Sequence, residues 1–221
     1  MQFTRGIRIG LIFSAYLLVC ALGYLGIIVY RQNLLGWFLI LTALLYGLGG
    51  PFLLRTNLKR EGVIRQERQD RSFWLILPGF LVVFYASPLE FLYVPQFLPR
   101  GQWIQIVGLV LITASFMLIT WAQQALKGRY SGRIQVVLGQ TLVQDGPYHY
   151  LRHPAYAGFL LMGIGISIGF SSLIGLFAVP ALLLPGLLYR IKVEERILHS
   201  QFGEQYTQYA QLTKRLFPGI W

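Results

Sequence analysis

Two long apolar runs decide the fold, and both lie in residues 156–190, YAGFLLMGIGISIGFSSLIGLFAVPALLLPGLLYR. The runs 156–170 and 173–190 are free of charged residues up to the last position, and only Ser171 and Ser172 separate them. A helix needs roughly 20 apolar residues to cross the hydrocarbon of a bilayer. Because so short a connection allows only a tight turn, the sequence predicts a hairpin of two membrane helices.

The composition of the whole chain also indicates a membrane protein. Hydrophobic residues make up 55% and charged residues 12% of the 221 positions, whereas a soluble domain has about 25% charged residues. Four further apolar runs meet the same length rule, and they cover residues 7–30, 34–54, 73–94 and 102–123. The run 73–94 contains Pro78, Pro88 and Glu90, so we expect a kinked span with an end at the interface, where Glu90 reaches water. The sequence therefore predicts an all-α integral membrane protein with about six transmembrane helices. We expect a single domain over 1–221, with four spans in 1–123 and a more polar part in 124–221.

The basic residues indicate how these spans cross the membrane. Of the 19 Lys and Arg residues, only Arg31 and Arg100 fall in connections on one side, and all the others fall on the opposite side. Cytoplasmic loops of membrane proteins carry an excess of Lys and Arg. The sequence therefore predicts that both termini are cytoplasmic. It also predicts that the polar segments 124–155 and 190–221 lie on the same face, where they can meet.

Several familiar kinds of site are missing from the sequence. The single cysteine, Cys20, allows neither an internal disulfide nor a cysteine-based zinc site. The three histidines lack a metal-ligand spacing with carboxylates, so no metal is expected. Gly163, Gly165 and Gly169 lie inside an apolar run, where small residues favour close helix packing over a dinucleotide-binding loop. Because the bases are confined between apolar runs, no nucleic-acid partner is expected either.

The first polar motif is QTLVQDGPYHYLRHPAY, residues 140–156. Pro154 suits the first position of a helix, so the fifth span should begin there, at the cytoplasmic face. The structural interpretation is that His153 only caps this helix while Arg152 reaches the lipid headgroups. The functional interpretation is that the crowded aromatic and polar groups line a site for a nucleoside or carboxylate, because free N–H groups at a helix N-terminus favour an anion.

The second polar motif is RIKVEERILHSQFGEQYTQYAQLTKRLFPGIW, residues 190–221, and it begins where the sixth span ends. Arg190 and Glu194 are four residues apart and therefore share a helix face, with Glu195 on the adjoining face. They could form an ordinary helix ion pair, worth about 0.3 to 0.5 kcal/mol. Alternatively, Glu194 receives an ammonium and Arg190 binds a carboxylate, the two charges that an amino-acid-like cofactor and an acidic acceptor would present.

Taken together, these two motifs resemble the isoprenylcysteine carboxyl methyltransferase family and, more distantly, the membrane phospholipid N-methyltransferases. The resemblance lies in the C-terminal part of the chain, and no single element is specific by itself. In order, its elements are Leu142-Val143, Gly146-Pro147-Tyr148, Arg152-His153-Pro154-Ala155-Tyr156 with Gly158, Glu194-Glu195, Phe202-Gly203 with Tyr206 and Tyr209, and Arg215 with Pro218.

The resemblance implies an integral-membrane methyltransferase that uses S-adenosylmethionine. It implies a cytoplasmic cofactor pocket formed by the loop after span four and the C-terminal helices, with Arg190 positioning an acceptor that enters from the bilayer. The cofactor-binding residues that it implies are Gln140, Thr141, Leu142, Val143, Tyr148, His153, Pro154, Ala155, Tyr156 and Glu194. Gln140 stands where the family usually has histidine, and a glutamine can still form a hydrogen bond there.

The predicted function is methyl transfer to a lipid-linked acceptor, foremost the carboxylate of a prenylated cysteine or a similar lipidic acid. A carboxylate attacks an activated methyl group without a general base. The amine of a phospholipid would need one, and His153 or Glu195 would be the candidates. A reductase with a nicotinamide cofactor and a non-catalytic membrane scaffold subunit are further alternatives. A transporter is disfavoured because the spans hold almost no charges at mid-membrane.

Overall fold

The computed structural model describes residues 63–66, 72–95, 97–126, 135–137 and 141–217. All of these residues belong to one compact unit, which covers 56–221. The predicted spans 7–30 and 34–54 lie outside the described residues, as does the candidate site residue Gln140. The count of six spans and the side on which each terminus lies therefore stay predictions.

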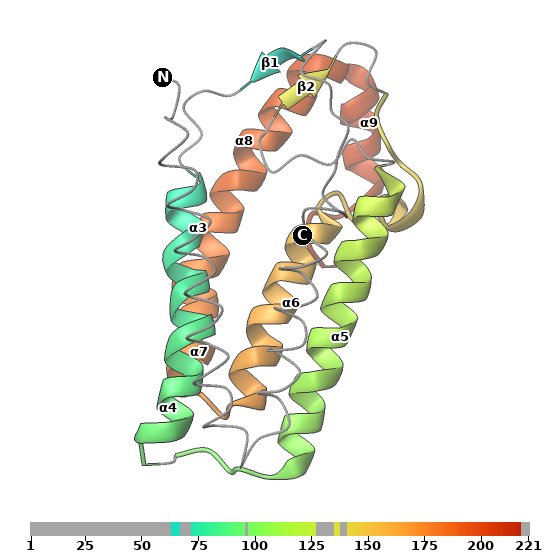
Figure 1. The fold of residues 1–221 in the computed structure, drawn as a ribbon. Helices are drawn as coiled ribbons and strands as arrows, with labels where there is room; N and C mark the ends of the chain where they lie inside the picture. Colours follow the sequence, from blue (N-terminus) through green and yellow to red (C-terminus); the bar gives the residue numbers. More distant parts are fainter. Residues whose placement is uncertain (1–62, 67–71, 96, 127–134, 138–140, 218–221) are drawn as a thin grey trace, which may run out of the picture. The chain divides into compact units, whose positions relative to one another are not determined.

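Helices form nearly all of the described structure (Figure 1). In chain order they are α3 (Ser72–Leu81), the π-helical segment η1 (Val82–Ala86), α4 (Ser87–Tyr93), α5 (Gln102–Ala125), the 3-10 turn η2 (Gly146–His149), α6 (Pro154–Gly169), α7 (Leu173–Ala178), the π-helical segment η3 (Val179–Leu183), α8 (Leu184–Phe202) and α9 (Glu204–Leu212). The structure adds two short antiparallel strands, β1 (Val63–Gln66) and β2 (Gln135–Val137), which the all-α prediction did not include. Strands of this length show too few alternating residues to be recognised in a sequence.

Three described helical segments are long and apolar enough to cross a membrane, and they are Ser72–Tyr93, Gln102–Ala125 and Leu173–Phe202. They correspond to the predicted spans 73–94, 102–123 and 173–190. The helix continues past the predicted span as far as Phe202, so Arg190 and Glu194 lie on one helix as predicted. The predicted fifth span corresponds to α6, a shorter apolar helix of 16 residues.

Prolines change the helix type locally in two of the spans. The π-helical segment η1 lies between Pro78 and Pro88, and η3 contains Pro180 and is followed by Pro185. A proline removes a backbone donor from the helix ladder, and a wider turn is one way for the chain to continue past it. The helical segments on either side therefore remain parts of the same span.

Glycines bring α5 and α6 into direct contact. A Cβ atom added at Gly108 would lie 2.5 Å from the Cα of Gly169, and one added at Gly158 would lie 2.5 Å from Cγ1 of Ile119. A Cβ at Gly165 would lie 3.0 Å from the carbonyl oxygen of Gly108. The predicted role of the α6 glycines in close helix packing is therefore confirmed at Gly165 and Gly169.

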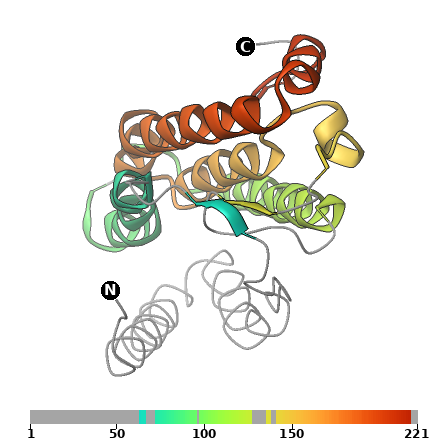
Figure 2. The ribbon, with the colours of Figure 1, turned by 90° about the horizontal axis from the view of Figure 1, so that it is seen from above.

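Glycines also bring α3 close to the last membrane segment. A Cβ atom added at Gly79 would lie 2.7 Å from the Cα of Leu183, and one added at Gly186 would lie 2.9 Å from the carbonyl oxygen of Leu75. Figure 2 shows α6 between α5 and the segment that contains α8. The described helices therefore form a bundle. The N-terminal turns of α3 and α6 and the C-terminal turns of α8 lie toward the same end of it.

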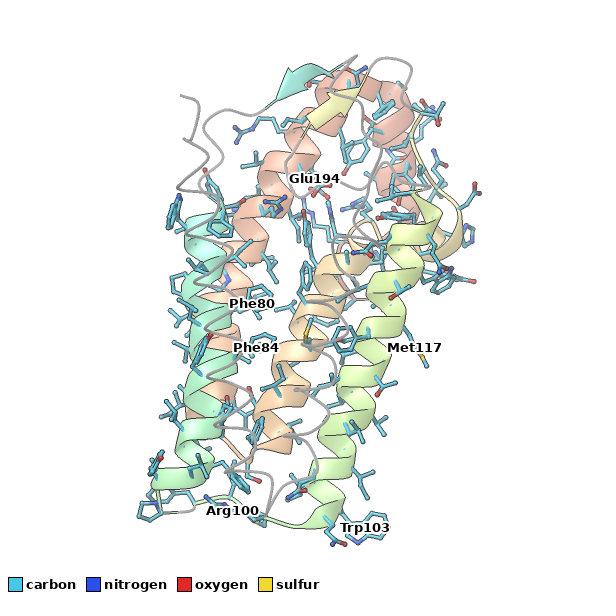
Figure 3. The ribbon with its side chains drawn as sticks, in the orientation of Figure 1. Phe80, Phe84, Arg100, Trp103, Met117 and Glu194 are labelled. Carbon is cyan, nitrogen blue, oxygen red and sulfur yellow. The ribbon has the colours of Figure 1, made fainter. Side chains whose placement is uncertain are left out.

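At the end of the bundle opposite Glu194 (Figure 3), a carboxylate contacts the start of a helix, which the sequence did not indicate. Glu90 was expected to reach water, but its carboxylate accepts hydrogen bonds from Ser172 Oγ and, at 3.1 Å, from the backbone N–H of Leu173. The N-terminus of a helix carries unsatisfied N–H groups and favours a negative charge. Glu90 therefore joins α4 to α7.

The two polar segments meet at the other end of the bundle. The backbone N–H of Arg152 donates to the carbonyl of Lys214 at 2.7 Å, and that of His153 donates to the carbonyl of Arg215 at 3.1 Å. The prediction that residues 124–155 and 190–221 share a face is confirmed for these described residues.

Candidate active site

The hydroxyl of Tyr156 links the two charged side chains that the sequence analysis placed at the centre of the site. Arg190 Nε donates to Tyr156 Oη at 2.8 Å, and Tyr156 Oη donates to Glu194 Oε2 at 2.7 Å. A phenol can accept one hydrogen bond and donate another. A cationic donor and an anionic acceptor are thus held apart by one neutral group, so Arg190 and Glu194 are more than an ordinary helix ion pair.

The start of α6 sets the position of Tyr156. Pro154 occupies the first turn of the helix, where its fixed φ favours helical backbone. The backbone N–H groups of Tyr156 and Ala157 both donate to the carbonyl of His153 at 3.1 Å. Pro154 and Ala155 are buried, so they shape the turn. The predicted start of the helix at Pro154 is confirmed.

His153 lies between two carboxylates. Its ring is stacked on the ring of Tyr156, with centroids 5.5 Å apart and an interplanar angle of 14°. Nδ1 lies 3.7 Å from Glu194 Oε2, and Nε2 lies 3.5 Å from Glu195 Oε1. The residue is only 4% exposed, and its side chain makes no capping hydrogen bond to α6. His153 therefore occupies the N-cap position of α6 without capping the helix through its side chain.

Glu195 holds two arginines that come from different segments, and we call Glu195, Arg152 and Arg215 the Glu195 clamp. Arg152 Nε donates to Glu195 Oε1 at 2.9 Å, and Arg215 Nε donates to Glu195 Oε2 at 3.0 Å. Arg152 Nη1 also donates to the carbonyls of Ala210 and Thr213, each at 2.6 Å. Arg152 therefore ties the loop before α6 to the end of α9, and it does not extend toward lipid headgroups.

Helix α9 is attached to the first polar motif through a tyrosine. Tyr209 Oη donates to the carbonyl of Tyr148 at 2.7 Å. Burial raises the pKa of Tyr209 to about 12, so its hydroxyl keeps the proton that this hydrogen bond requires. Burial also raises the pKa of Tyr206, which is packed beside Tyr209 with ring centroids 6.1 Å apart. Both tyrosines are buried, so they pack α9 against neighbouring residues.

The other candidate cofactor residues lie on the segment that leads into η2. Thr141 is exposed, and Leu142 and Val143 are half-buried. Tyr148 is half-buried within η2 and is attached to α9 through its carbonyl. This segment lies at the polar end of the bundle (Figure 1). The contacts of these residues with a cofactor stay a prediction.

Sequence reasoning missed one residue of the site, Ser72. Its Oγ lies 3.0 Å from Arg190 Nη1, which donates to it, and its side chain is completely buried at the first position of α3. A serine before an apolar run is usually interpreted as a helix cap. Because 118 residues separate Ser72 from Arg190 in the chain, no local pattern could have paired them.

An aromatic row leads from this polar group toward the apolar part of the bundle. The ring of Phe159 lies 6.3 Å from that of Tyr156 and 5.7 Å from that of Phe80 on α3. Phe80 and Phe84 lie farther from the polar end than Glu194 does (Figure 3). The Glu194 side chain is 32% exposed. The site thus offers an accessible carboxylate and a fixed guanidinium at the edge of an apolar region.

One known protein family is similar to this part of the chain. Residues 106–200 match the model of the isoprenylcysteine carboxyl methyltransferase family. This range contains Tyr156, Arg190 and Glu194, and it does not contain Ser72.

Three methyltransferases are similar in sequence over more than half of the chain. Protein-S-isoprenylcysteine O-methyltransferase B of Arabidopsis thaliana is 29% identical over 145 residues, which are 63% of this chain and 74% of the plant protein. The protein-S-isoprenylcysteine O-methyltransferases of Tribolium castaneum and Schizosaccharomyces pombe are each 29% identical, over 142 and 135 residues. The matched regions cover 61% of this chain in both cases and about half of those proteins, 50% and 52%.

The fold is similar to that of a solved membrane enzyme, the eukaryotic intramembrane Ras methyltransferase ICMT. The TM-score is 0.62 with 22% sequence identity, over 92% of this chain and 74% of that chain. At this identity the likeness concerns the fold alone. The sequence matches show that the chain is similar to the isoprenylcysteine carboxyl methyltransferases, as its two polar motifs predicted.

Proposed function

We propose that the protein transfers a methyl group from S-adenosylmethionine to a lipid-linked carboxylate, such as that of a prenylated cysteine. The observation that carries this proposal is the Tyr156 hydroxyl, which holds Arg190 at 2.8 Å and Glu194 at 2.7 Å. It supports the proposal because a cation suited to a carboxylate lies beside an anion suited to an ammonium. The names of the similar proteins support the same reaction.

Glu194 binds the ammonium of the cofactor in this proposal. One feature fits that role: its side chain is 32% exposed, so a ligand can reach the carboxylate. The proposal assigns the other cofactor contacts to Gln140, Thr141, Leu142, Val143, Tyr148, Pro154, Ala155 and Tyr156.

The chain contributes positioning to the reaction. S-adenosylmethionine, when bound, supplies a methyl group that its sulfonium already activates. Arg190 orients the acceptor carboxylate through a planar guanidinium, which can hold two oxygens at once. Tyr156 keeps this guanidinium a fixed distance from Glu194, and the apolar residues beside it exclude water. No side chain has to accept a proton, since a carboxylate acceptor carries none.

The same geometry disfavours an amine acceptor. Methylation of a phospholipid amine needs a general base with access to the amine proton. Glu195 is held by Arg152 and Arg215, at 2.9 and 3.0 Å. The ring of His153 is buried and stacked against Tyr156. Neither candidate base offers an open proton-accepting atom at the surface of the site.

Two measurements on the purified full chain test the proposal. Calorimetric titration should give binding heat with S-adenosylmethionine and none with NADPH. Radiolabelled methyl should then pass to an S-prenylated cysteine that has a free carboxylate, and the product should be a base-labile ester. The matched control acceptor is the carboxamide of the same compound, which should receive no label. Label on the amine of phosphatidylethanolamine, or binding of NADPH in place of S-adenosylmethionine, would contradict the proposal.

A further inference from the structure

We infer that Ser72 on α3 is a positioning residue for the acceptor, because its hydroxyl helps to fix the guanidinium of Arg190. This inference rests on the proposed function, in which Arg190 holds the acceptor carboxylate. It adds a helix that lies outside the residues matched by the family model, which begin at residue 106.

Two helices hold the guanidinium at two different nitrogens. Tyr156 on α6 accepts from Nε at 2.8 Å, and Ser72 on α3 accepts from Nη1 at 3.0 Å. The Cζ atom of Arg190 also lies 5.9 Å from the centroid of the Tyr156 ring. A guanidinium is planar, so two anchored nitrogens define both its position and the direction of its plane. The Ser72 contact thus adds a second anchor to the one at Nε.

The close approach of α3 and α8 explains why a residue as small as serine reaches Arg190. A Cβ atom added at Gly186 on α8 would lie 2.9 Å from the backbone of Leu75 on α3. Ser72 lies one helical turn before Leu75 and is completely buried. A buried hydroxyl is almost always hydrogen-bonded. The Ser72 hydroxyl is satisfied across the helix interface by a charged donor of the proposed site.

Ordering the Arg190 side chain before the ligands bind should strengthen acceptor binding and should not change cofactor binding. A long side chain that is ordered before binding loses less freedom when the ligand arrives. Removal of the Ser72 hydroxyl should therefore weaken the acceptor site, whereas the Tyr156 to Glu194 contact at 2.7 Å does not involve Ser72. A merely structural serine would affect both ligands or neither.

The first test compares Ser72→Ala with Ser72→Thr and with the matched control Ser87→Ala. Ser87 is also completely buried and in the same span, and its hydroxyl has no hydrogen-bond partner among the described residues. We expect Ser72→Ala to raise the acceptor KM about threefold to tenfold, the range for the net contribution of one ordinary hydrogen bond. S-adenosylmethionine affinity should stay unchanged. Ser72→Thr should restore the KM, and Ser87→Ala should resemble the wild type.

A second test does not depend on methyl transfer. Phenylglyoxal reacts with accessible arginines, and mass spectrometry of the peptide that contains Arg190 gives its rate of modification. Ser72→Ala should speed this modification severalfold, and Ser87→Ala should not. Equal rates in Ser72→Ala and wild type would overturn the inference, as would a faster rate with an unchanged acceptor KM. Absence of methyl transfer in the wild type would contradict the proposed function alone, because the modification rate still reports on Ser72 and Arg190.

Discussion

Tyr156 Oη donates to Glu194 Oε2 at 2.7 Å while it accepts from Arg190 Nε at 2.8 Å, so one phenol joins the proposed cofactor and acceptor residues. Its removal should therefore affect both ligands. We expect Tyr156→Phe to weaken S-adenosylmethionine binding and acceptor binding, each by about 1.5 to 3 kcal/mol, the worth of a hydrogen bond to a charged group. Calorimetry and acceptor KM measure the two effects. The control is Tyr150→Phe at an exposed tyrosine of the same motif.

A loss confined to one ligand in the Tyr156→Phe protein would contradict the linking role. The phenol would then belong to the cofactor site or to the acceptor site, and Arg190 and Glu194 would be positioned independently.

The charge of Glu194 should determine cofactor affinity. Glu194→Gln preserves the shape of the side chain and removes its charge, so the affinity for S-adenosylmethionine should fall by about 1.5 to 3 kcal/mol. Glu204→Gln, at an exposed position on α9, should leave the affinity unchanged. Full cofactor affinity in a folded Glu194→Gln protein would remove Glu194 from the site.

Arg190→Lys should distinguish a carboxylate acceptor from a phospholipid acceptor. Lysine is a point charge and cannot reproduce the two parallel bonds of a guanidinium to a carboxylate. For a carboxylate acceptor, methyl transfer should fall severely while S-adenosylmethionine binding is nearly intact. A phosphate-bearing lipid should show only a mild loss. Arg196→Lys, at an exposed arginine farther along α8, is the matched control.

Unimpaired methyl transfer by Arg190→Lys would exclude Arg190 as a carboxylate clamp. Loss of cofactor binding in the same variant would instead place Arg190 in the cofactor pocket.

The Glu195 clamp should stabilise the C-terminal segment. Glu195→Gln leaves two guanidiniums, those of Arg152 and Arg215, without their anionic partner. Breaking a largely buried ion pair from one side is strongly destabilising, here by about 3 kcal/mol. Thermal unfolding should show the loss, and limited proteolysis should cut the chain after α8 sooner than in Glu204→Gln. Unchanged unfolding and proteolysis would mean that the clamp adds no stability.

The predicted membrane orientation can be tested with two exposed positions in a Cys20→Ser background. Ser171 and Ser172 lie in the connecting turn but are buried, so cysteines there would be poor reporters. Phe97 is 81% exposed and Leu212 is 85% exposed, at opposite ends of the bundle. An impermeant maleimide should label Phe97→Cys in intact cells and Leu212→Cys only after permeabilisation. The reverse pattern would place the C-terminus outside.

The structural features that could be predicted from the sequence are those that depend only on neighbouring residues. An apolar run of sufficient length predicts a membrane helix whatever surrounds it, and the segments Ser72–Tyr93 and Gln102–Ala125 lie where they were expected. Pro154 begins α6 because its own ring fixes its φ angle. The order of the two polar motifs was also enough to show the family resemblance.

The sequence could not indicate where a charged side chain finds a partner that is distant in the chain. Glu90 was expected in water, yet it satisfies the amide groups at the start of α7, whose position only the folded chain defines.

Tertiary structure alone decided how the site is assembled. The sequence placed Arg190 and Glu194 on one helix face, but it could not indicate that Tyr156 stands between them. Nor could it pair Ser72 with Arg190 across 118 residues. Hydrogen bonds require atoms within about 3 Å in a suitable direction. Such distances between remote residues exist only after α3, α6 and α8 have packed, and that packing depends on contacts along the whole length of the helices.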